Sequence, residues 1–544
     1  MKARGFDYVI IGAGSAGCTL ANRLGEDSGK SILLLEAGPM DRNLLIHVPA
    51  GVYNVWRNPK LNWNHGTVPE PGYAGRELFT PRGRVVGGSS SINSMVYMRG
   101  HPLDFDGWAA REGMAHWAFE HCLPYFKAGE DFAGGASEWR GAGGPLGTMR
   151  SDFENPLFDA FIEAGGQAGQ GNTEDPNGWQ PEGVCRLDAT KRHGRRCSAA
   201  VAHLRPALRR GNVTLMTGAA VQRICVTDGR ASGVEVLHRG AVQVIEAGEV
   251  ILSGGAINSP QLLMLSGIGP ADHLVAHGIV PIADLPGVGA NLQDHPCLIL
   301  QYESLKGFPI HKVDQPIRKA MAGAQWVFTR QGMAASNIWE VGGLIRGNDQ
   351  VDYANLQYHV APVGFDYVDG KIQLNQAFAV HIDVLRPRSR GHVRLRSGDP
   401  QAKPALTFNY LTDPDDLQQM VEGVRKTRDL VRQPAFAGLA GREMGPSAEA
   451  QSDAEIAAHI QAVSESDFHP CGTCRMGMGA DAVVDPQFRV HGVDRLRVVD
   501  ASVFPRITSA NLNAPTQMIA ARAADFIAGR AQKPPERARY AFMD

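Results

Sequence analysis

A glycine-rich turn near the N-terminus has the residue types and spacing that bind phosphate groups. Gly12, Gly14 and Gly17 stand between an apolar, β-branched segment and a segment with helical periodicity. Gly12 permits a tight turn, Gly14 lets backbone N–H groups approach a pyrophosphate, and Gly17 lets the helix pack close to the sheet. The helix N-terminus would add N–H donors and a positive dipole end. These residues predict a dinucleotide site.

An acidic residue stands where such a site binds ribose. Glu36 lies 19 residues after Gly17 and directly follows a second apolar segment. Its carboxylate can accept hydrogen bonds from ribose hydroxyls and would repel the 2′-phosphate of NADP. These residues leave FAD and NAD both open. The alternative is an ordinary glycine-rich turn, and the acid in register argues against it.

Hydrophobic patterning predicts the elements that position this loop. Residues 6–11 and 31–35 are apolar, short and β-branched, which favours two buried strands. Residues 18–24 carry the apolar spacing of a helix between them. Strand, glycine loop, helix, strand and acid in this order are typical of a dinucleotide-binding unit.

Three further regions combine glycines with hydroxyl or amide side chains. Residues 83–93 contain Gly-Gly-Ser-Ser-Ser-Ile-Asn, and residues 254–269 contain Gly-Gly-Ala-Ile-Asn-Ser-Pro before an apolar run that ends in Gly-Ile-Gly. Near the C-terminus, Phe-His-Pro at 468–470 precedes Val-Asp-Ala-Ser at 499–502 and Asn-Leu-Asn-Ala-Pro at 511–515. Each segment alone could be a structural turn. Their order behind a dinucleotide site is more informative.

In this order the segments resemble the glucose–methanol–choline (GMC) family of flavin oxidoreductases. The resemblance runs from residue 6 to about residue 529. Within the family the chain is most similar to the bacterial branch of choline-dehydrogenase-like and aliphatic alcohol dehydrogenases, through residues 61–63, 89–100 and 469–477. The resemblance implies an α/β FAD-binding domain of the Rossmann type and an α+β substrate domain built on an antiparallel sheet.

The resemblance implies FAD rather than NAD as cofactor. By this resemblance, the first glycine loop would bind the ADP half of FAD, and the backbone at Val221 would contact the adenine. The second glycine segment would line the flavin and the diphosphate, and Asp500 and Ala501 would close over the ribityl chain. The residues that would contact FAD are Gly12, Gly14, Ser15, Ala16, Gly17, Glu36, Ala37, Val86, Gly88, Ser89, Asn93, Ser94, Met95, Val96, Val221, Asp500, Ala501 and Asn511. Some members attach the flavin through a histidine. The matching residue here is Ile92, which cannot bond to the ring, so we predict non-covalent FAD.

The same resemblance indicates two catalytic residues. His469 matches the catalytic histidine, and its ordinary pKa suits a general base that takes the hydroxyl proton. Asn513 matches the second active-site position and would orient the substrate oxygen, because an amide is no base near pH 7. Phe468 matches an aromatic residue that faces flavin or substrate in relatives. A turn histidine before a proline and a core aromatic are the structural alternatives.

Two cysteines, Cys471 and Cys474, form a CxxC motif directly after the predicted base. Alone, such a motif suggests a redox dithiol or half of a zinc site. The sequence has no second CxxC to complete four ligands, and we predict no metal. The resemblance makes the motif part of the segment that carries the base.

Flavin-binding segments at both ends and in the middle predict a discontinuous organisation. We assign residues 1–150, 201–296 and 461–530 to the FAD-binding domain, residues 151–200 and 297–460 to the substrate-binding domain, and residues 531–544 to a polar C-terminal tail. Within the substrate domain we expect strands at 352–359, 378–384 and 392–396. We expect a helix over 414–432, capped by Asp413 and begun by Pro414.

Composition excludes several classes of protein. Of 544 residues, 43% are hydrophobic and 20% charged, which is typical of a globular chain. The formal net charge of −2 argues against a nucleic-acid partner. No apolar run is long enough for a spanning helix, no signal peptide precedes the first strand, and eight cysteines form no disulfide framework. We therefore expect a cytoplasmic protein, with peripheral attachment to the inner face of the membrane left open.

The substrate is less well defined by the sequence. Choline would need an aromatic cage and a carboxylate, and the candidates are Tyr53 and the Trp339–Glu340 pair. An apolar wall would suit an aliphatic or aryl primary alcohol, which we favour. The electron acceptor would be a quinone, a dye-like acceptor or oxygen. Alternatives are choline dehydrogenase, an oxygen-using alcohol or aryl-alcohol oxidase, a flavin-containing hydroxynitrile lyase of the same fold, and an inactive binding protein.

Overall fold

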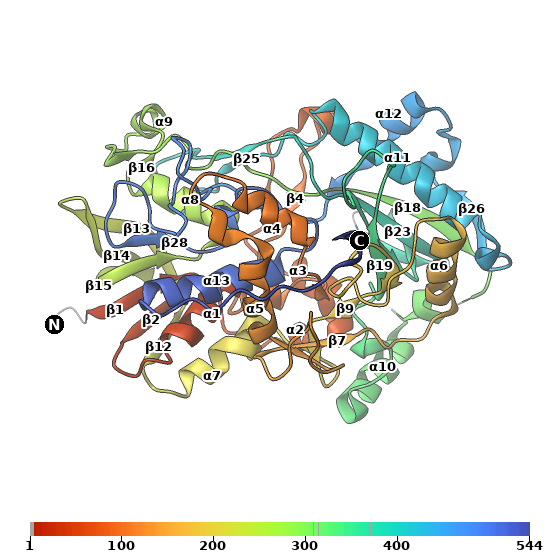
Figure 1. The fold of residues 1–544 in the computed structure, drawn as a ribbon, viewed down its shortest axis with the longest axis horizontal. Coiled ribbons are helices and arrows are strands. Elements are labelled where there is room, and N and C mark those ends of the chain that lie inside the picture. The colour runs from red at the N-terminus through yellow and green to blue at the C-terminus, as the bar shows by residue number, and fades with distance from the viewer. Residues whose placement is uncertain (1–4, 308, 314, 369–370, 544) are drawn as a thin grey trace.

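The computed structural model describes residues 5–307, 309–313, 315–368 and 371–543. Two large sheets lie at opposite ends of the long axis of the molecule (Figure 1). The first has the order β12-β2-β1-β15-β14-β13, and β28 pairs with β15. Its strands are β1 (Phe6–Ile11), β2 (Ile32–Glu36), β12 (Val213–Thr217), β13 (Ala219–Thr227), β14 (Arg230–His238), β15 (Ala241–Leu252) and β28 (Leu496–Val498).

The core of the first sheet is parallel, as the strand–helix–strand pattern requires. β1 pairs with both β2 and β15 in parallel, and β13 and β14 extend the sheet as antiparallel strands. Helix α1 (Ser15–Leu24) connects β1 to β2 and packs against α13 (Asn513–Ile527). This packing places a helix from the C-terminal part of the chain beside the first glycine loop.

The second sheet is antiparallel and has the order β26-β18-β23-β20-β19-β8, with β27 paired to β18. Its strands are β8 (Gly183–Arg186), β18 (Pro296–Ser304), β19 (Val341–Ile345), β20 (Leu356–Ala361), β23 (Ala377–Val384), β26 (Ala440–Met444) and β27 (Glu465–Ser466). Helices α6 (Pro156–Gln167) and α11 (Pro414–Val431) pack on one face of it. The opposite face turns toward the first sheet.

Strand register decides which side chains that inner face presents. Cys297 of β18 pairs with Asp383 of β23, and His381 of β23 pairs with Ile299 on one side and His359 on the other. Paired residues lie on the same face of a sheet, as do residues two apart along a strand. The inner face therefore gathers a thiol, a carboxylate and two imidazoles at one place.

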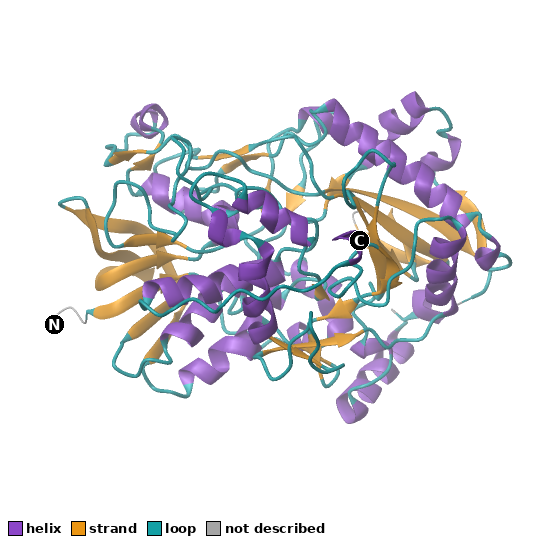
Figure 2. Cartoon of the chain, viewed as in Figure 1, coloured by secondary structure: helices purple, strands orange, loops and turns teal. Residues whose placement is uncertain are grey.

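The remaining helices and strands cover these sheets (Figure 2). They are α2 (Leu44–His47), α3 (Val52–Trp56), α4 (Pro102–Ala109), α5 (Phe119–Gly129), α7 (Arg205–Leu208), α8 (Gly255–Leu265), α9 (Ala271–Ala276), α10 (Pro316–Thr329) and α12 (Asp453–Val463). The short strands are β3 (His65–Gly66), β4 (Phe79–Thr80), β5 (Val96–Tyr97), β6 (Glu130–Phe132), β7 (Leu146–Arg150), β9 (Asp188–Ala189), β10 (Lys191–Arg192), β11 (Arg195–Arg196), β16 (Ile268–Gly269), β17 (Ala283–Asp284), β21 (Gly364–Val368), β22 (Lys371–Asn375), β24 (His392–Arg394) and β25 (Ala405–Thr407).

Several local expectations need correction. The strand expected from residue 352 begins at Leu356, because the carbonyls of Tyr353 and Ala354 accept hydrogen bonds from Arg386 and the Tyr353 hydroxyl donates to Asp104. The strand expected over 392–396 ends at residue 394 and pairs only with β25, outside the large sheet.

One further element matches the expectation, and the C-terminal segment makes contacts that the expected polar tail did not include. Helix α11 begins at Pro414, and the Asp413 side chain accepts from the Asp415 N–H, as expected of an N-cap. The C-terminal segment packs against the body: the Glu536 N–H donates to the Glu120 carbonyl, and the Ala541 N–H donates to that of Trp179. The domain boundaries remain a prediction.

Candidate active site

A cavity of about 740 Å³ is lined by residues from both large sheets. Almost every residue predicted to contact the cofactor lines it, and so do His469, Asn513, Phe468, Tyr53 and Trp339. Gly17 and Val86 are the exceptions among the predicted cofactor residues. Gly17 lies inside α1 against β1, and Val86 packs into the hydrophobic core.

The first glycine loop is shaped for close approach on both of its sides. A Cβ on Gly17 would lie 1.9 Å from the Gly12 carbonyl oxygen, so the α1–β1 contact requires glycine there. A Cβ on Gly14 would find only the Cα of Gly88, at 4.0 Å, and would otherwise project into the cavity. Gly17 therefore serves the packing of the fold, and Gly14 keeps the cavity open.

Glu36 lies at the end of β2, with its carboxylate beside the glycine loop. Oε2 accepts from the Ala13 N–H at 3.0 Å, and Oε1 accepts from the Gly38 N–H at 2.8 Å. Burial raises the pKa of Glu36 to about 7, although these two hydrogen bonds oppose the shift. The side chain lines the cavity together with Ala37.

The second glycine segment lies directly on the first. The Gly87 N–H donates to the Ala13 carbonyl, and a Cβ on Gly88 would come within 2.7 Å of the Gly14 Cα. Arg196 holds the following turn, because its Nη1 donates to Oδ1 of Asn93 at 2.7 Å. Arg196 is fully buried, and burial lowers the pKa of its guanidinium to about 9. The sequence did not identify Arg196, which matches no local motif.

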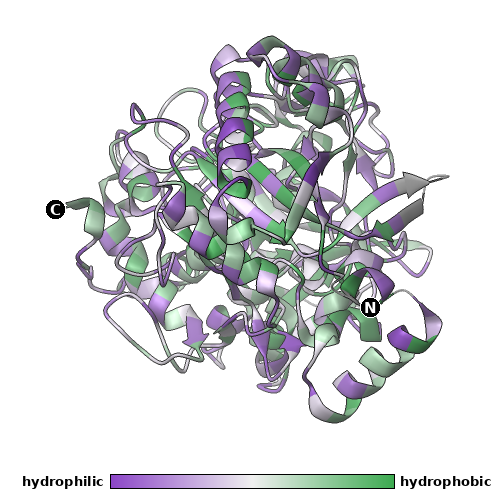
Figure 3. Cartoon of the chain, turned by 90° about the vertical axis from the view of Figure 1, so that its right-hand side faces the viewer, coloured by the Kyte–Doolittle hydropathy of each residue, from purple (hydrophilic) through white to green (hydrophobic). Residues whose placement is uncertain are grey.

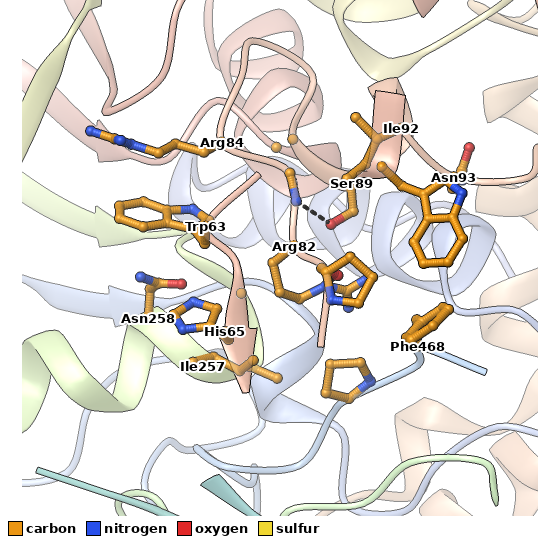
Figure 4. Close-up of a pocket in the computed structure, with 18 of the residues that line it drawn as sticks. Trp63, His65, Arg82, Arg84, Ser89, Ile92, Asn93, Ile257, Asn258 and Phe468 are labelled. Carbon is orange, nitrogen blue, oxygen red and sulfur yellow. Dashed lines mark hydrogen bonds between the residues drawn. The ribbon is translucent and has the colours of Figure 1, made fainter. Parts of the chain in front are cut away.

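Figure 4 shows the end of the cavity where this segment faces residues 63–65. The Gly83 N–H donates to Oγ of Ser89 at 3.2 Å. The rings of Trp63 and His65 stack with centroids 6.1 Å apart, and burial lowers the pKa of His65 to about 3. Neither ring was predicted as a site residue, although Trp63 lies in a segment that carried the family resemblance.

The contributions of Val221 and Asp500 differ in kind. The ladder between β13 and β14 shifts register between Val221 and Arg223, which interrupts regular pairing where the strand borders the cavity. The carboxylate of Asp500 accepts from the Gly255 N–H at 2.8 Å and from the Ser259 hydroxyl at 2.6 Å. Asp500 therefore fixes the start of α8 and the position of the neighbouring Ala501.

His469 lies at the junction of the two sheets. Its Nδ1 is 3.0 Å from Nδ1 of His295 and 3.1 Å from Oδ2 of Asp467. The backbone N–H of His469 donates to Oδ1 of Asp294. Burial lowers the pKa of His469 well below its ordinary value, with further lowering from His295 and His359. The imidazole is therefore neutral near pH 7, the form that can accept a proton.

An asparagine side chain bonds to this histidine, and it is Asn511 and not Asn513. Nδ2 of Asn511 donates to Nε2 of His469 at 3.2 Å. Oδ1 of Asn513 instead accepts from the Ser15 hydroxyl at 2.8 Å and from Gln517 at 3.1 Å. Asn513 is the first residue of α13, so its side chain is directed toward α1. Asn511, which the sequence assigned to the cofactor, therefore contacts the predicted base, whereas Asn513 lines the cavity without bonding to that base.

A polar cluster from the second sheet lies behind His469. His359 Nδ1 is 3.1 Å from Oδ2 of Asp383, and the thiol of Cys297 is 3.8 Å from Nδ1 of His381. Donor atoms of Cys297, Asp383 and Asp467 lie within 4.8 Å of one another, so these three could hold a metal ion. Burial, with the neighbouring carboxylates of Asp383 and Asp294, raises the pKa of Asp467 well above its ordinary value.

An apolar and aromatic wall borders this polar cluster, since Ile299 pairs with His381 across the ladder between β18 and β23. Phe468 adopts a left-handed backbone with φ of 64°, and its ring lies 5.5 Å from that of Trp56. Tyr53 packs edge-on against Trp56, with centroids 5.6 Å apart. The aliphatic and aromatic residues that complete the wall are Ile299, Ile338, Trp339, Ala361, Val363, Phe365 and Leu374.

The aromatic–acid pair expected at residues 339 and 340 is divided. Trp339 lines the cavity, whereas Glu340 is fully buried outside it. Glu340 Oε2 accepts from the Phe153 N–H at 2.8 Å, and Lys191 lies 3.8 Å from Oε1. Of this pair, only Trp339 can therefore reach a substrate.

The CxxC motif lies behind the base. Cys471 and Cys474 are buried and are both free thiols. Burial raises the pKa of each thiol well above its ordinary value, which suppresses the reactive thiolate. The motif therefore packs the segment that carries His469.

Comparison with known proteins agrees with this geometry. Family models described as GMC oxidoreductase match residues 6–297 and 387–520. The oxygen-dependent choline dehydrogenase of Rhizobium etli is 47% identical over 96% of each chain. That of Staphylococcus aureus is 43% identical over 98% of this chain and 95% of its own.

Solved structures extend the similarity to the fold. Pyridoxine 4-oxidase from Mesorbium loti superposes with a TM-score of 0.87 at 31% identity, over 97% of this chain and 100% of its own. Formate oxidase of Aspergillus oryzae superposes with a TM-score of 0.89 at 28% identity, over 96% of this chain and 98% of its own.

In the described part of the chain, no helix is both long and apolar enough to cross a membrane. The family relationship, the relatives and the cavity together identify a flavoprotein that uses FAD to oxidise the CH–OH group of an alcohol. This chain is a member of the GMC oxidoreductase family.

Proposed function

We propose that this enzyme oxidises an apolar primary alcohol to an aldehyde, with His469 as the general base. The observation that supports this proposal is the position of His469. It lies beside polar groups that can fix its tautomer, in a cavity whose apolar wall can hold the carbon chain of an alcohol. Non-covalent FAD would occupy the rest of the cavity.

The residues around the glycine loops fit FAD. Gly14 leaves open space where a Cβ would project, as close approach of a pyrophosphate requires. Glu36 is a buried carboxylate without an ion-pair partner among the described residues, and its hydrogen bonds come from two backbone N–H groups. Ribose hydroxyls would supply further donors. Ile92 packs against Val85 and offers no atom for a covalent link to the flavin.

The tautomer of His469 follows from its neighbours. Nδ1 faces His295 and Asp467, so a proton on Nδ1 can be shared with either of them. Nε2 is then unprotonated and faces Asn511. In this arrangement Nε2 takes the hydroxyl proton of the alcohol, and the Asn511 amide donates to the developing alkoxide oxygen.

The bound flavin supplies the acceptor for the hydride that leaves the carbinol carbon. The protein's part is to hold that carbon in place, keep water out and remove the proton. Asp467 and His295 act on His469 and do not reach the substrate oxygen in this scheme. They are positioning residues, because they hold the imidazole with Nε2 toward Asn511.

The wall supports an apolar substituent on the alcohol. Ile299, Ala361 and Val363 form its aliphatic part, and Phe365 with Trp339 forms its aromatic part. The acids that line this end of the cavity are Glu465 and Asp467. Burial raises the pKa of both, which disfavours the anionic form that would attract a quaternary ammonium group.

Choline is the second candidate. Its support is the 47% identity to the oxygen-dependent choline dehydrogenase of Rhizobium etli, together with the aromatic rings of Tyr53, Trp56, Trp339, Phe365 and Phe468 around the cavity. Aromatic faces attract quaternary ammonium ions. The raised pKa values of the two acids weigh against this candidate.

Anaerobic bleaching of the flavin separates the two candidates. The holoenzyme is mixed with choline, 1-hexanol or benzyl alcohol, and the second-order rate constant of reduction is compared. The proposal expects both apolar alcohols to exceed choline by at least about ten-fold. Phe365→Ala should weaken the response to benzyl alcohol, because the variant removes apolar contact area. A choline rate that equals or exceeds both alcohols would reverse the assignment.

The acceptor is tested in the same preparation. Reoxidation is followed with oxygen, with a soluble quinone and with an artificial dye. We propose a quinone or another non-oxygen acceptor. Reoxidation by air at least as fast as by quinone would instead support an oxidase.

A further inference from the structure

Helix α10 (Pro316–Thr329) projects from the body of the molecule (Figures 1 and 3). Its large apolar side chains are among the most exposed in the described chain: Phe328 is 86% exposed, Ile317 76% and Met321 67%. Apolar side chains scattered singly over a surface need no explanation. Four exposed apolar side chains on one helix, with Val327 at 50%, do need one.

Helical geometry places three of these side chains on a single stripe. Ile317, Met321, Ala324 and Phe328 fall at i, i+4, i+7 and i+11, the spacing of one helix face. Trp326 falls on the opposite face and is the buried residue of the helix. The stripe therefore points away from the protein.

Trp326 is the anchor that fixes this orientation. Its Nε1 donates to the Gly194 carbonyl at 2.7 Å, and its ring packs with Ala334, Ala335 and Val48. Val48 directly follows helix α2 (Leu44–His47), in which Leu44 and Leu45 are exposed.

The segment around α10 is positively charged. Residues 305–330 contain five Lys or Arg and one Asp, in a chain whose net charge is −2. Lys312 and Arg318 are exposed at the start of the helix. A basic helix with an apolar face is typical of segments that lie in the interface of an anionic membrane.

We propose that α10 docks this enzyme onto an anionic lipid surface. The stripe enters the boundary between headgroups and acyl chains, and the flanking lysines and arginines contact the anionic headgroups. A second copy of this chain is a poorer occupant, because two copies of the same positively charged segment would repel one another. This proposal concerns attachment and does not depend on the identity of the alcohol.

Docking would place one wall of the cavity beside the membrane. Ile338 and Trp339 line the cavity and lie nine and ten residues after the end of α10. Tyr53 and Trp56, also in the wall, follow closely after Val48. An apolar alcohol and a lipid-soluble quinone, the proposed substrate and acceptor, both concentrate in a membrane.

Co-sedimentation with vesicles tests the proposal on the holoenzyme. Binding is measured to vesicles of phosphatidylcholine with and without phosphatidylglycerol, in low and high salt. We expect binding to the anionic vesicles and its loss in high salt. The paired change Met321→Ser and Phe328→Ser should weaken binding about ten-fold or more, because it removes apolar area from the stripe.

A matched control lies at the far corner of the molecule. Val275 in α9 and Val280 just after it are 64% and 80% exposed, so Val275→Ser with Val280→Ser removes exposed apolar area elsewhere. This control should bind vesicles like the wild type. Both paired variants should keep the wild-type flavin content and the wild-type rate of flavin reduction by a soluble alcohol.

Three results would overturn the proposal. One is failure of the wild-type protein to co-sediment with anionic vesicles. Another is equal binding by the α10 variant and the wild type. The third is a dimer, measured by sedimentation without lipid, that the α10 variant converts to a monomer, since the stripe would then be an interface between copies of this chain.

Discussion

Nδ2 of Asn511 lies 3.2 Å from Nε2 of His469, whereas Asn513 bonds to Ser15. In the proposed mechanism, Asn511 and His469 are the two side chains that contact the substrate oxygen. The alcohol hydroxyl would bind between them, where one group accepts its proton and the other donates to the oxygen that remains.

Substitution of the two asparagines should therefore give different results. Asn511→Ala should slow anaerobic flavin reduction about 10²-fold, the usual effect of removing one donor from a developing oxyanion. Asn513→Ala should slow it far less, because its contacts hold α13 to α1. The measurement is stopped-flow bleaching at saturating alcohol. A larger loss in Asn513→Ala would restore the assignment made from sequence.

The pH dependence of reduction should reflect the buried state of His469. Burial lowers its pKa well below the ordinary value of about 6.5. The neutral base is the active form, so the rate should stay constant as pH falls through 6.5 and decline only at lower pH. An acidic limb centred at or above pH 6.5 in the rate of flavin reduction would contradict this expectation.

Two glycines of the first loop should fail in different ways when replaced by alanine. Gly14→Ala should change the free energy of unfolding of the apoprotein by less than about 1 kcal/mol and reduce the FAD content at least about ten-fold, since its Cβ enters the cavity. Gly17→Ala should cost about 3 kcal/mol, since its Cβ meets a backbone oxygen at 1.9 Å. Normal FAD binding by Gly14→Ala would refute the placement of the pyrophosphate.

The identity of residue 92 predicts how the flavin leaves the protein. Ile92 lines the cavity and packs with Ile46, Val55 and Val85, so it holds the cofactor through contact alone. Denaturation in acid followed by centrifugation should leave the yellow colour in the supernatant. Colour retained in the precipitate, or a flavin peptide after proteolysis, would disprove non-covalent binding.

Much of the cofactor site was predictable because it is built from short, contiguous segments. The first loop and Glu36 sit in one strand–helix–strand unit, where spacing determines geometry. The helix from Pro414 was predictable for the same reason, since its cap and first residue are local signals. The strand expected from residue 352 failed because a distant arginine, Arg386, bonds to its first carbonyls.

The substrate side was less predictable because strand register creates it. Cys297, His359, His381 and Asp383 come from three strands and share a face only when those strands pair. The contact of Asn511 with His469 was not predicted, because it depends on where α13 begins and local sequence does not determine that boundary to a single residue. The division of Trp339 from Glu340 likewise depends on backbone direction and not on residue type.

Anaerobic flavin reduction in His469→Ala tests the central claim most directly. The variant and the wild type are loaded with FAD, matched for flavin content and mixed with an alcohol that bleaches the wild type. With His469 as general base, reduction in the variant should be slower by about 10²–10⁴-fold. Reduction at the wild-type rate, with the flavin fully bound, would show that another group takes the proton.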